Sequence, residues 1–310
     1  MKERHALPTW EPGVKELAPD VYAYIQGKAT WFWNNAGFIV GRDYVVVVDS
    51  LATVGLTQKF RDEIRNITDK PIRYLINTHH HGDHIWGDHV FAGATIISHR
   101  YCRQEAVQTG VIDPALLNAM FTDFDFRGIA VTPAHITFDS ELTLHMDGRE
   151  VRLLHLGPGH TAGDIIVRLP EEGIIFVGDL IFLYSTPLGM EGSFAGWLQD
   201  LYALADLGAH TYVPGHGPVC GMEGLNLCRD YLLLVRHEAK QRFDQGMTVD
   251  EAARDIPLGK YKHWPDRERI LANVERLWRE FRGEDPATSK LDIPDLFLRM
   301  ATMAQAGEPW

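Results

Sequence analysis

The chain has 310 residues, and 45% of them are hydrophobic, so it can bury a large core. Its 42 acidic and 30 basic residues give a net charge of -12, which argues against a nucleic-acid partner and against an anionic membrane surface. The three cysteines are widely spaced without a CxxC pair, and no apolar run forms a signal peptide or a membrane span. These features predict a cytoplasmic protein.

The first half of the chain is dominated by short β-rich runs. Residues 1–20 are rich in proline and charge and predict a surface segment. Runs broken by glycine then predict strands at 21–26, 31–40, 44–49, 72–77 and 94–98. Apolar residues at helical spacing predict one helix over 56–68.

The second half alternates strands and helices after a different kind of segment. Residues 105–134 mix a short helix with an aromatic run and predict an insertion or lid. Strands are predicted at 136–138, 141–145, 151–155, 164–169, 173–177 and 211–213, and a helix at 194–207. This order of elements predicts an α/β sandwich over residues 21–222, in which two sheets pack face to face with helices outside.

Residues 223–310 predict a helical C-terminal extension packed on the same domain. Its helices could cover the sandwich or pair two chains into a homodimer. The sequence leaves both alternatives open.

A histidine-rich segment at residues 78–84 directly follows the predicted strand 72–77. His79 and His81 lie two positions apart and can point to the same side of an extended backbone. Asp83 and His84 follow Gly82, which lets the chain turn sharply. Imidazole and carboxylate are ligands that zinc prefers, so the segment predicts a metal site rather than a solvated histidine-rich loop.

Three later loops each place one further ligand-type residue beside glycine. His160 lies in GPGHT, Asp179 in FVGD and His216 in VPGHG, and the last two follow apolar strands. Taken singly, Gly-His and Gly-Asp are common turn pairs. Their order behind the histidine-rich segment is what predicts a shared site.

The ordered motifs HxHxDH, GH, GD and PGHG resemble the metallo-β-lactamase superfamily over about residues 20–220. The resemblance implies an αββα sandwich of two mixed β-sheets with a dinuclear metal site at one edge. By position it implies a first metal held by His79, His81 and His160, a second held by Asp83, His84 and His216, and Asp179 as a bridge.

The resemblance also gives a role to Asp49, which ends the apolar strand 45–48. It implies a buried carboxylate that orients the histidine-rich loop. The alternative from the sequence is a simple turn residue at the end of a strand.

Two Zn²⁺ per chain are the first expectation for the metals, and iron or manganese fit the same nitrogen and oxygen ligands. Two cations about 3.5–4 Å apart can lower the pKa of a shared water toward ~7, so that hydroxide attacks a carbonyl carbon. Asp83 is the candidate proton acceptor as well as a ligand. No protein nucleophile is required, so the cysteines are interpreted as structural.

The types of ligand indicate which branch of the superfamily the chain resembles. His81 stands where oxygen-reducing di-iron members carry glutamate, which favours hydrolysis over redox chemistry. A bridging Asp179 resembles the thioesterase and lactonase branches more than true β-lactamases. We therefore predict hydrolysis of a thioester, ester or lactone. The alternatives are Lewis-acid ring closure, β-lactamase-like amide hydrolysis and a non-catalytic metal-stabilised binding protein.

A narrower resemblance is to the cyclase/thioesterase proteins of bacterial aromatic polyketide pathways. It is carried by residues 30–38, 77–87, 192–198 and 270–281, whereas 110–134 and the tail after 283 are not clearly matched. It implies a small-molecule acyl substrate.

Aromatic and apolar residues near the motifs are candidates for a substrate pocket. Trp31 and Trp33 alternate on the predicted strand 31–40, so they face one side, either toward the site or into the core. Phe121 and Phe124 could form an apolar lid or fill the body of the fold. The remaining candidates follow the bridging aspartate in a loop and are Phe182, Tyr184 and Met190. Such a pocket suits a hydrophobic or aromatic acyl group better than a phosphate.

Overall fold

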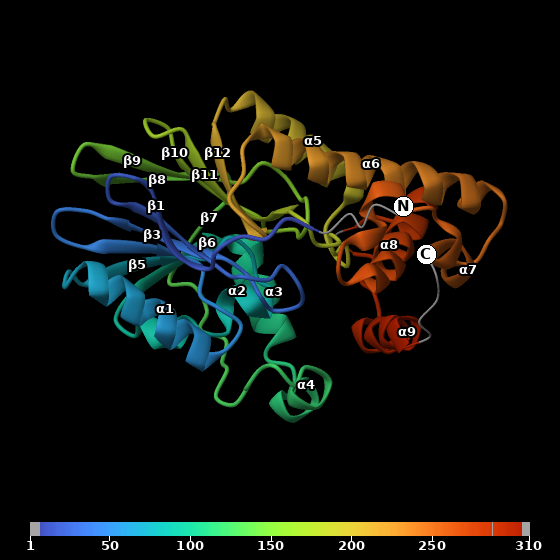
Figure 1. Ribbon diagram of the computed structural model, residues 1–310, viewed down its shortest axis with the longest axis horizontal. Coiled ribbons are helices and arrows are strands. Elements are labelled where there is room, and N and C mark those ends of the chain that lie inside the picture. Colours follow the sequence, from blue (N-terminus) through green and yellow to red (C-terminus); the bar gives the residue numbers. More distant parts are fainter. Residues whose placement is uncertain (1–6, 287, 306–310) are drawn as a thin grey trace.

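A computed structural model describes residues 7–286 and 288–305 of the chain. Two mixed β-sheets pack face to face and carry helices on both outer faces (Figure 1). This is the predicted αββα sandwich, and the helices that follow residue 221 lie beside one end of it. Within the described ranges, no helix combines the length and apolar character needed to cross a bilayer.

The first sheet has seven strands in chain order. They are β1 (Gly13–Ala18), β2 (Val21–Ile25), β3 (Ala36–Val40), β4 (Val45–Val48), β5 (Ile72–Ile76), β6 (Thr95–His99) and β7 (Ile136–Phe138). Strands β1 to β4 pair antiparallel, and β4 to β7 pair parallel. Residues 13–18, predicted only as surface segment, therefore form the edge strand β1.

The second sheet has five strands in the order β12-β11-β10-β9-β8. They are β8 (Glu141–Met146), β9 (Arg149–Leu154), β10 (Ile166–Leu169), β11 (Ile174–Phe182) and β12 (Thr211–His216). Only the β11–β12 pair is parallel. Strand β11 is longer than predicted: all nine of its residues are buried, and its pairing with β12 extends to Phe182 opposite His216.

Each outer face of the sandwich is covered by amphipathic helices. Helix α1 (Val54–Ile67) begins at the Thr53 cap and buries Phe60 and Ile64 against the first sheet. The second sheet is covered by α5 (Phe194–Asp206) and α6 (Met222–Asp244). Burial of these apolar stripes away from water is the main force that holds the layers together.

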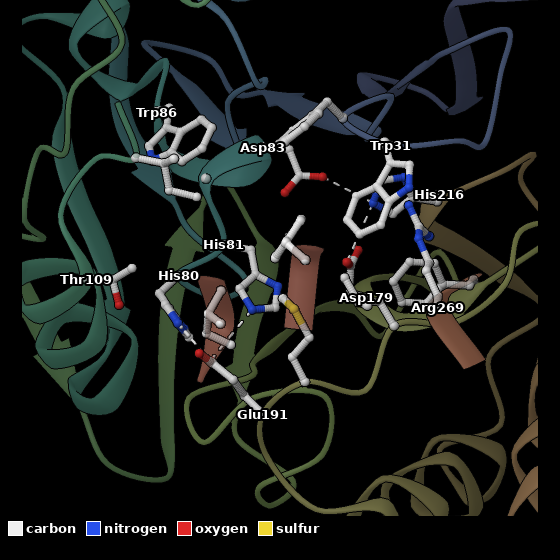
Figure 2. Close-up of a pocket in the computed structure, with 18 of the residues that line it drawn as sticks. Trp31, His80, His81, Asp83, Trp86, Thr109, Asp179, Glu191, His216 and Arg269 are labelled. Atoms are coloured by element: carbon white, nitrogen blue, oxygen red, sulfur yellow. Dashed lines mark ion pairs between the residues drawn. The ribbon is translucent and has the colours of Figure 1, made fainter. Parts of the chain in front are cut away.

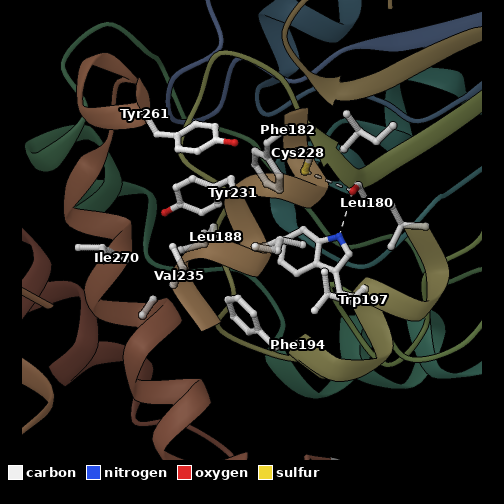
Figure 3. Packing of buried hydrophobic residues seen from close by; sticks show 14 of the residues in the cluster. Leu180, Phe182, Leu188, Phe194, Trp197, Cys228, Tyr231, Val235, Tyr261 and Ile270 are labelled. Carbon is white, nitrogen blue, oxygen red and sulfur yellow. Dashed lines mark hydrogen bonds between the residues drawn. The ribbon is translucent and has the colours of Figure 1, made fainter. Parts of the chain in front are cut away.

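The C-terminal helices share one apolar cluster with the second sheet. Their bounds are α7 (Val249–Asp255), the 3-10 turns η2 (Gly259–His263) and η3 (Arg267–Arg269), α8 (Ile270–Phe281) and α9 (Ile293–Gln305). Figure 3 shows Tyr231 of α6 and Ile270 of α8 packed with Phe182 and Trp197 in this cluster. The Trp197 Nε1 donates a hydrogen bond to the Leu180 carbonyl of β11, 2.9 Å away. The extension is thus continuous with the core.

The segment predicted as an insertion contains two helices and an aromatic loop. Helix α3 (Arg100–Thr109) overlaps the start of this segment, and α4 (Pro114–Met120) is capped by Asp113. The short elements α2 (Gly82–Ile85) and η1 (Asp88–Phe91) lie before β6. Together with Phe32 and Trp86, Phe126 forms a buried aromatic cluster under this segment.

Candidate metal centre

The candidate metal ligands lie at or near the ends of strands at one edge of the sandwich. The histidine-rich segment follows β5 and leads into α2, and His160 lies in the loop between β9 and β10. His216 ends β12, whereas Asp179 lies inside β11, three residues before that strand ends. Strands that end at the same edge bring these distant residues together.

The first set of ligands consists of His79, His81 and His160 with Asp179. One ligand atom from each residue lies within 4.8 Å of the others. The His81 Nδ1 is 2.9 Å from the His160 Nε2, and Asp179 Oδ2 is 3.5 Å from the His160 Nε2. These distances bring four donor atoms around one point.

The second set consists of Asp83, His84 and His216, again with ligand atoms within 4.8 Å of one another. The His216 Nε2 lies 3.3 Å from Asp83 Oδ2 and 3.5 Å from Asp179 Oδ2. The other Asp179 oxygen, Oδ1, is 3.1 Å from the His84 Nε2. The Asp179 carboxylate therefore faces both sets, as a bridging ligand would.

Several of the ligand atoms that face the centre lack hydrogen-bond partners. The Nε2 atoms of His79 and His84 and the Oδ1 of Asp179 are buried without a hydrogen bond. Unsatisfied buried polar atoms are costly unless something else compensates them. A divalent cation in each set would satisfy them, and the mixture of imidazole and carboxylate is suited to such ions. The His/Asp cluster thus fits divalent metal binding.

Asp49 fixes the orientation of two of these histidines. It is buried at the end of β4, where its Oδ2 lies 2.9 Å from the His84 Nδ1 and 2.7 Å from the Thr78 hydroxyl. The Thr78 hydroxyl donates to Asp49, so it accepts from the Nδ1–H of His79, 3.0 Å away. Both rings then direct an unprotonated Nε2 at the centre. Asp49 therefore has the contacts expected of an orienting carboxylate.

Burial and neighbouring charge act in opposite directions within the cluster. Burial, together with the nearby His81, lowers the pKa of His160 to about 3. Burial raises the pKa of Asp83, but His84 and His216 outweigh it and hold that pKa at about 2. A neutral His160 and an ionised Asp83 are the protonation states in which such side chains bind metal. Asp179 and Asp83 outweigh burial at His84 and His216 and raise the pKa of both, so these two histidines would release protons when a cation binds.

An open cleft leads to the two ligand sets. Figure 2 shows His81, Asp83, Asp179 and His216 at its polar side, with Trp31 and Trp86 across it. The apolar walls come from distant parts of the chain and consist of Trp31, Phe32, Trp86, Ile112, Phe182, Leu188, Met190, Ile293 and Phe297.

The sequence-predicted pocket residues separate into two groups. Trp31, Phe182 and Met190 line this cleft, whereas Trp33, Phe121, Phe124 and Tyr184 are not among its lining residues. The ring centroids of Trp33 and Phe124 lie 5.0 Å apart, and Phe121 packs on Phe32 at 4.8 Å. Tyr184 faces Trp10 and Trp264 at 6.3 and 6.4 Å.

The prediction that Trp31 and Trp33 share a strand face is wrong, because β3 begins only at Ala36. Residues 31 and 32 form a turn in which Phe32 has a φ of 61°. This backbone conformation breaks the alternation of side chains, so only Trp31 reaches the cleft.

Several lining residues carried no signal in the sequence. Glu191, Arg269 and Phe297 lie outside the motifs, and only the fold brings them to the cleft. His80 is buried beside Glu191, although its position inside the histidine run could have marked it.

The fold and the two ligand sets define a metal-binding αββα protein. Residues 29–216 match the family Lactamase_B, described as the metallo-beta-lactamase superfamily. The chain therefore belongs to the metallo-β-lactamase superfamily.

Individual relatives have different activities. The chain is 24% identical over 282 residues to linear primary-alkylsulfatase from a Pseudomonas species, a match that covers 77% of this chain and 51% of the relative. It is 24% identical to metallo-beta-lactamase type 2 from Bacteroides fragilis over 68% of this chain and 81% of that protein. It is 26% identical to hydroxyacylglutathione hydrolase from Maricaulis maris over 58% and 60% of the two chains. The chain thus spans only about half the length of the alkylsulfatase.

Solved structures show the same fold. The sec-alkylsulfatase Pisa1 from a Pseudomonas species superposes with a TM-score of 0.64 at 18% identity, over 89% of this chain and 51% of that one. The metallo-beta-lactamase FIM-1 from Pseudomonas aeruginosa in its mono-zinc form gives 0.56 at 24% identity, over 73% and 97%.

Proposed function

We propose that this protein is a dinuclear metal-dependent hydrolase of a carboxylic thioester, ester or lactone with a hydrophobic or aromatic acyl part. The observation that carries the proposal is the pair of ligand sets that share Asp179 at the polar side of an apolar cleft. Two zinc ions are the proposed metals, in line with the zinc in one structural neighbour.

When bound, two divalent cations supply an activated water and polarise the substrate carbonyl oxygen. The chain's own residues would position the ligands and accept the proton. Asp83 lines the cleft as an ionised carboxylate and is the proposed proton acceptor, although ligation competes with that role. Asp49 holds the His84 ring, and Asp179 spans the two sets.

The walls of the cleft favour an apolar substrate. Among the described residues that line it, Arg269 is the only arginine or lysine. Its guanidinium already pairs with Asp266 at 2.9 Å and donates to the Thr186 carbonyl at 2.9 Å. A paired cation offers little to a phosphate, whereas the surrounding aromatic rings suit a hydrophobic acyl group.

Hydrolysis of a sulfate ester is the second candidate. The alkylsulfatase Pisa1 aligns over 89% of this chain, a share that requires part of the helical extension beyond residue 216. The paired state of Arg269 weighs against an anionic substrate group, so this candidate ranks below carbonyl hydrolysis.

The type of reaction and the location of the protein in the cell also belong to the proposal. A polyketide-type cyclase or thioesterase would use the same apolar cleft and the same metals, with ring closure in place of water addition. A β-lactamase-like amide hydrolase is a further outcome of the substrate test. A reducing, cytoplasmic location is consistent with Cys102, Cys220 and Cys228, which are all free and buried.

The test combines metal analysis with a substrate panel. Purified protein should retain two divalent ions per chain and hydrolyse acyl thioesters, aryl esters or lactones faster than alkyl sulfates, phosphodiesters and β-lactams. Labelled solvent oxygen should enter the product, which separates hydrolysis from ring closure.

The variants His81→Ala and Asp179→Ala should each lose at least 100-fold in kcat/KM, since ligand loss removes a cation (about 3 kcal/mol at ~1.4 kcal/mol per tenfold). Full turnover after complete metal removal would reject the proposal.

A further inference from the structure

We infer that Glu191 is a positioning residue for the ligand His81, and that helix α8 holds it in place. The inference rests on the proposed metal centre. Glu191 lies outside all the sequence motifs, in the segment between β11 and α5.

Glu191 lies between two consecutive histidines. Its Oε2 is 2.9 Å from the His80 Nε2 and 3.6 Å from the His81 Nε2 (Figure 2). The His80 side chain is 3% exposed and that of Glu191 20%, so the contact is largely shielded from water. Burial raises the pKa of Glu191, but His80 and His81 outweigh it and hold that pKa well below its usual value.

The two ring nitrogens of His81 have different surroundings. Its Nδ1 lies 2.9 Å from the His160 Nε2, inside the first ligand set. A neutral imidazole that binds a cation through Nδ1 carries its proton on Nε2. That Nε2 is buried without a hydrogen bond, and the Glu191 carboxylate is the charged acceptor that faces it. Metal-binding histidines commonly donate this second N–H to a carboxylate, which fixes the ring and raises its basicity.

The distribution of charge between the two ligand sets also supports a role for the contact between Glu191 and His81. The second ligand set has its own carboxylate, Asp83, whereas the first set has three histidines and only a share of Asp179. Glu191 adds a negative charge next to this first set. Because His80 also contacts the same oxygen, that carboxylate is retained beside the His81 ring.

Helix α8 binds the backbone of the segment that carries Glu191. Asn273 Oδ1 accepts from the Gly189 N–H at 2.6 Å, and its Nδ2 donates to the Pro187 carbonyl at 2.9 Å. One turn later, the Arg276 Nη2 donates to the Met190 carbonyl at 3.1 Å. Asn273 and Arg276 are 0% and 1% exposed.

Residues before and after Asn273 and Arg276 on the same face of the C-terminal region also bind the backbone between the end of β11 and the start of α5. Arg269 donates to the Thr186 carbonyl, and Glu280 accepts from the Phe194 N–H at 2.6 Å. Side chains three or four positions apart share one helix face, so successive residues of α8 meet successive peptides of the segment. The segment is thereby fixed in register, which sets the direction of the Glu191 side chain.

A third metal ion held by His80, His81 and Glu191 is the rival interpretation, because their ligand atoms also cluster within 4.8 Å. It would require His81 to bind cations through both nitrogens as an imidazolate. The 2.9 Å contact between His80 and Glu191 is already a hydrogen-bonding distance, so we favour the positioning role.

The experiment measures metal affinity in the apoprotein. Glu191→Gln keeps the size of the side chain and removes its charge, Glu191→Asp keeps the charge, and Glu171→Gln is a matched control at an exposed turn. Each is combined with His216→Ala, which leaves the first set intact, or with His79→Ala, which leaves the second. Zinc binding is followed by calorimetry, and thermal unfolding of each apoprotein checks folding.

We expect Glu191→Gln to weaken zinc binding by about 10- to 100-fold in the His216→Ala background, with no change in the His79→Ala background. Glu191→Asp should restore part of the affinity, and Glu171→Gln should match the parent. Equal losses in both backgrounds, or no loss in either, would overturn the positioning role. A third zinc equivalent in the parent that Glu191→Gln abolishes would instead show that Glu191 is a ligand.

This result is separable from the proposed function. A parent that binds zinc with the expected Glu191 dependence but hydrolyses no carbonyl substrate would defeat the function alone. An active hydrolase whose first set is indifferent to Glu191→Gln would defeat the inference alone.

Discussion

At the scale of single residues, the buried carboxyl groups near the centre, Asp49 and Asp200, have different partners and different protonation states. Asp49 is satisfied by Thr78 and His84, so its charge is used to orient ligands. Asp200 of α5 is also buried, yet its Oδ2 has no hydrogen-bond partner. Burial, with the nearby Asp164, raises the pKa of Asp200 to about 8. Asp200 is therefore protonated in the folded protein at neutral pH.

This state of Asp200 predicts a pH dependence of stability. An unfolded aspartate has a pKa of about 3.9, so the folded state binds the extra proton between about pH 4 and pH 8. The free energy of unfolding should fall as the pH rises through that window. Asp200→Asn should flatten the fall, as measured by urea unfolding at pH 5 and pH 8. An unchanged slope in the variant would contradict the assignment, and Asp43→Asn in an exposed turn is the control.

At the scale of elements, the parallel pair β11–β12 places two ligands side by side. Asp179, the proposed bridging ligand, lies within β11, and His216 ends β12. Gly215 makes this approach possible, because a Cβ at this position would lie 1.8 Å from the Asp179 Oδ1. The space is taken by backbone on its other side, with the Gly178 carbonyl carbon at 2.9 Å from the same point. A side chain at residue 215 would have to displace the carboxylate.

Gly215→Ala should therefore lose at least one metal equivalent and most of the activity, since Asp179 cannot reach both ligand sets. Metal content after gel filtration and kcat/KM give the readouts. Gly55→Ala, in α1 with open space around its Cβ, is the control and should raise stability by up to about 1 kcal/mol. Retention of both metals by Gly215→Ala would show that Asp179 has room to shift.

At the scale of the whole molecule, the cleft is lined both by the sandwich and by the segments added to it, which are the predicted insertion and the C-terminal helices. Trp31 comes from the loop before β3, Ile112 from the predicted insertion, and Ile293 and Phe297 from α9. The rings of Trp31 and Phe297 lie 5.5 Å apart, which links the N-terminal half to the last helix. In the proposed hydrolase, selectivity for the acyl group would therefore depend on parts of the chain that lie outside the metal motifs.

Phe297→Ala should raise KM for long acyl substrates by about 10-fold, because the half-buried Phe297 ring contributes part of the roughly 1.5–3 kcal/mol that a fully buried Phe side chain is worth. The kcat for a short acetyl substrate should change little, since the metal ligands are untouched. Leu298→Ala, on the same helix at 68% exposure, is the control. Equal effects on long and short substrates would place the acyl group elsewhere.

Much of this arrangement could be predicted because its signals are local. The histidine-rich segment carries five ligand-type side chains in six residues, and glycine beside His160, Asp179 and His216 marks close backbone approach. The strand and helix periods predicted the layers, whose burial follows the same pattern. Trp33 failed as a pocket residue because the positive φ of Phe32 cannot be inferred from alternation.

The sequence by itself determined which side chains could bind metal and which layers could bury a core, because ligand chemistry and hydrophobic period are properties of neighbouring residues. Only the tertiary structure decided that Glu191 faces His81, that α8 fixes the segment carrying it, and that Phe297 walls the cleft. These contacts join residues separated by up to about two hundred and sixty positions, as Trp31 and Phe297 are. No local pattern encodes such a contact, because its energy exists only once the chain has closed on itself.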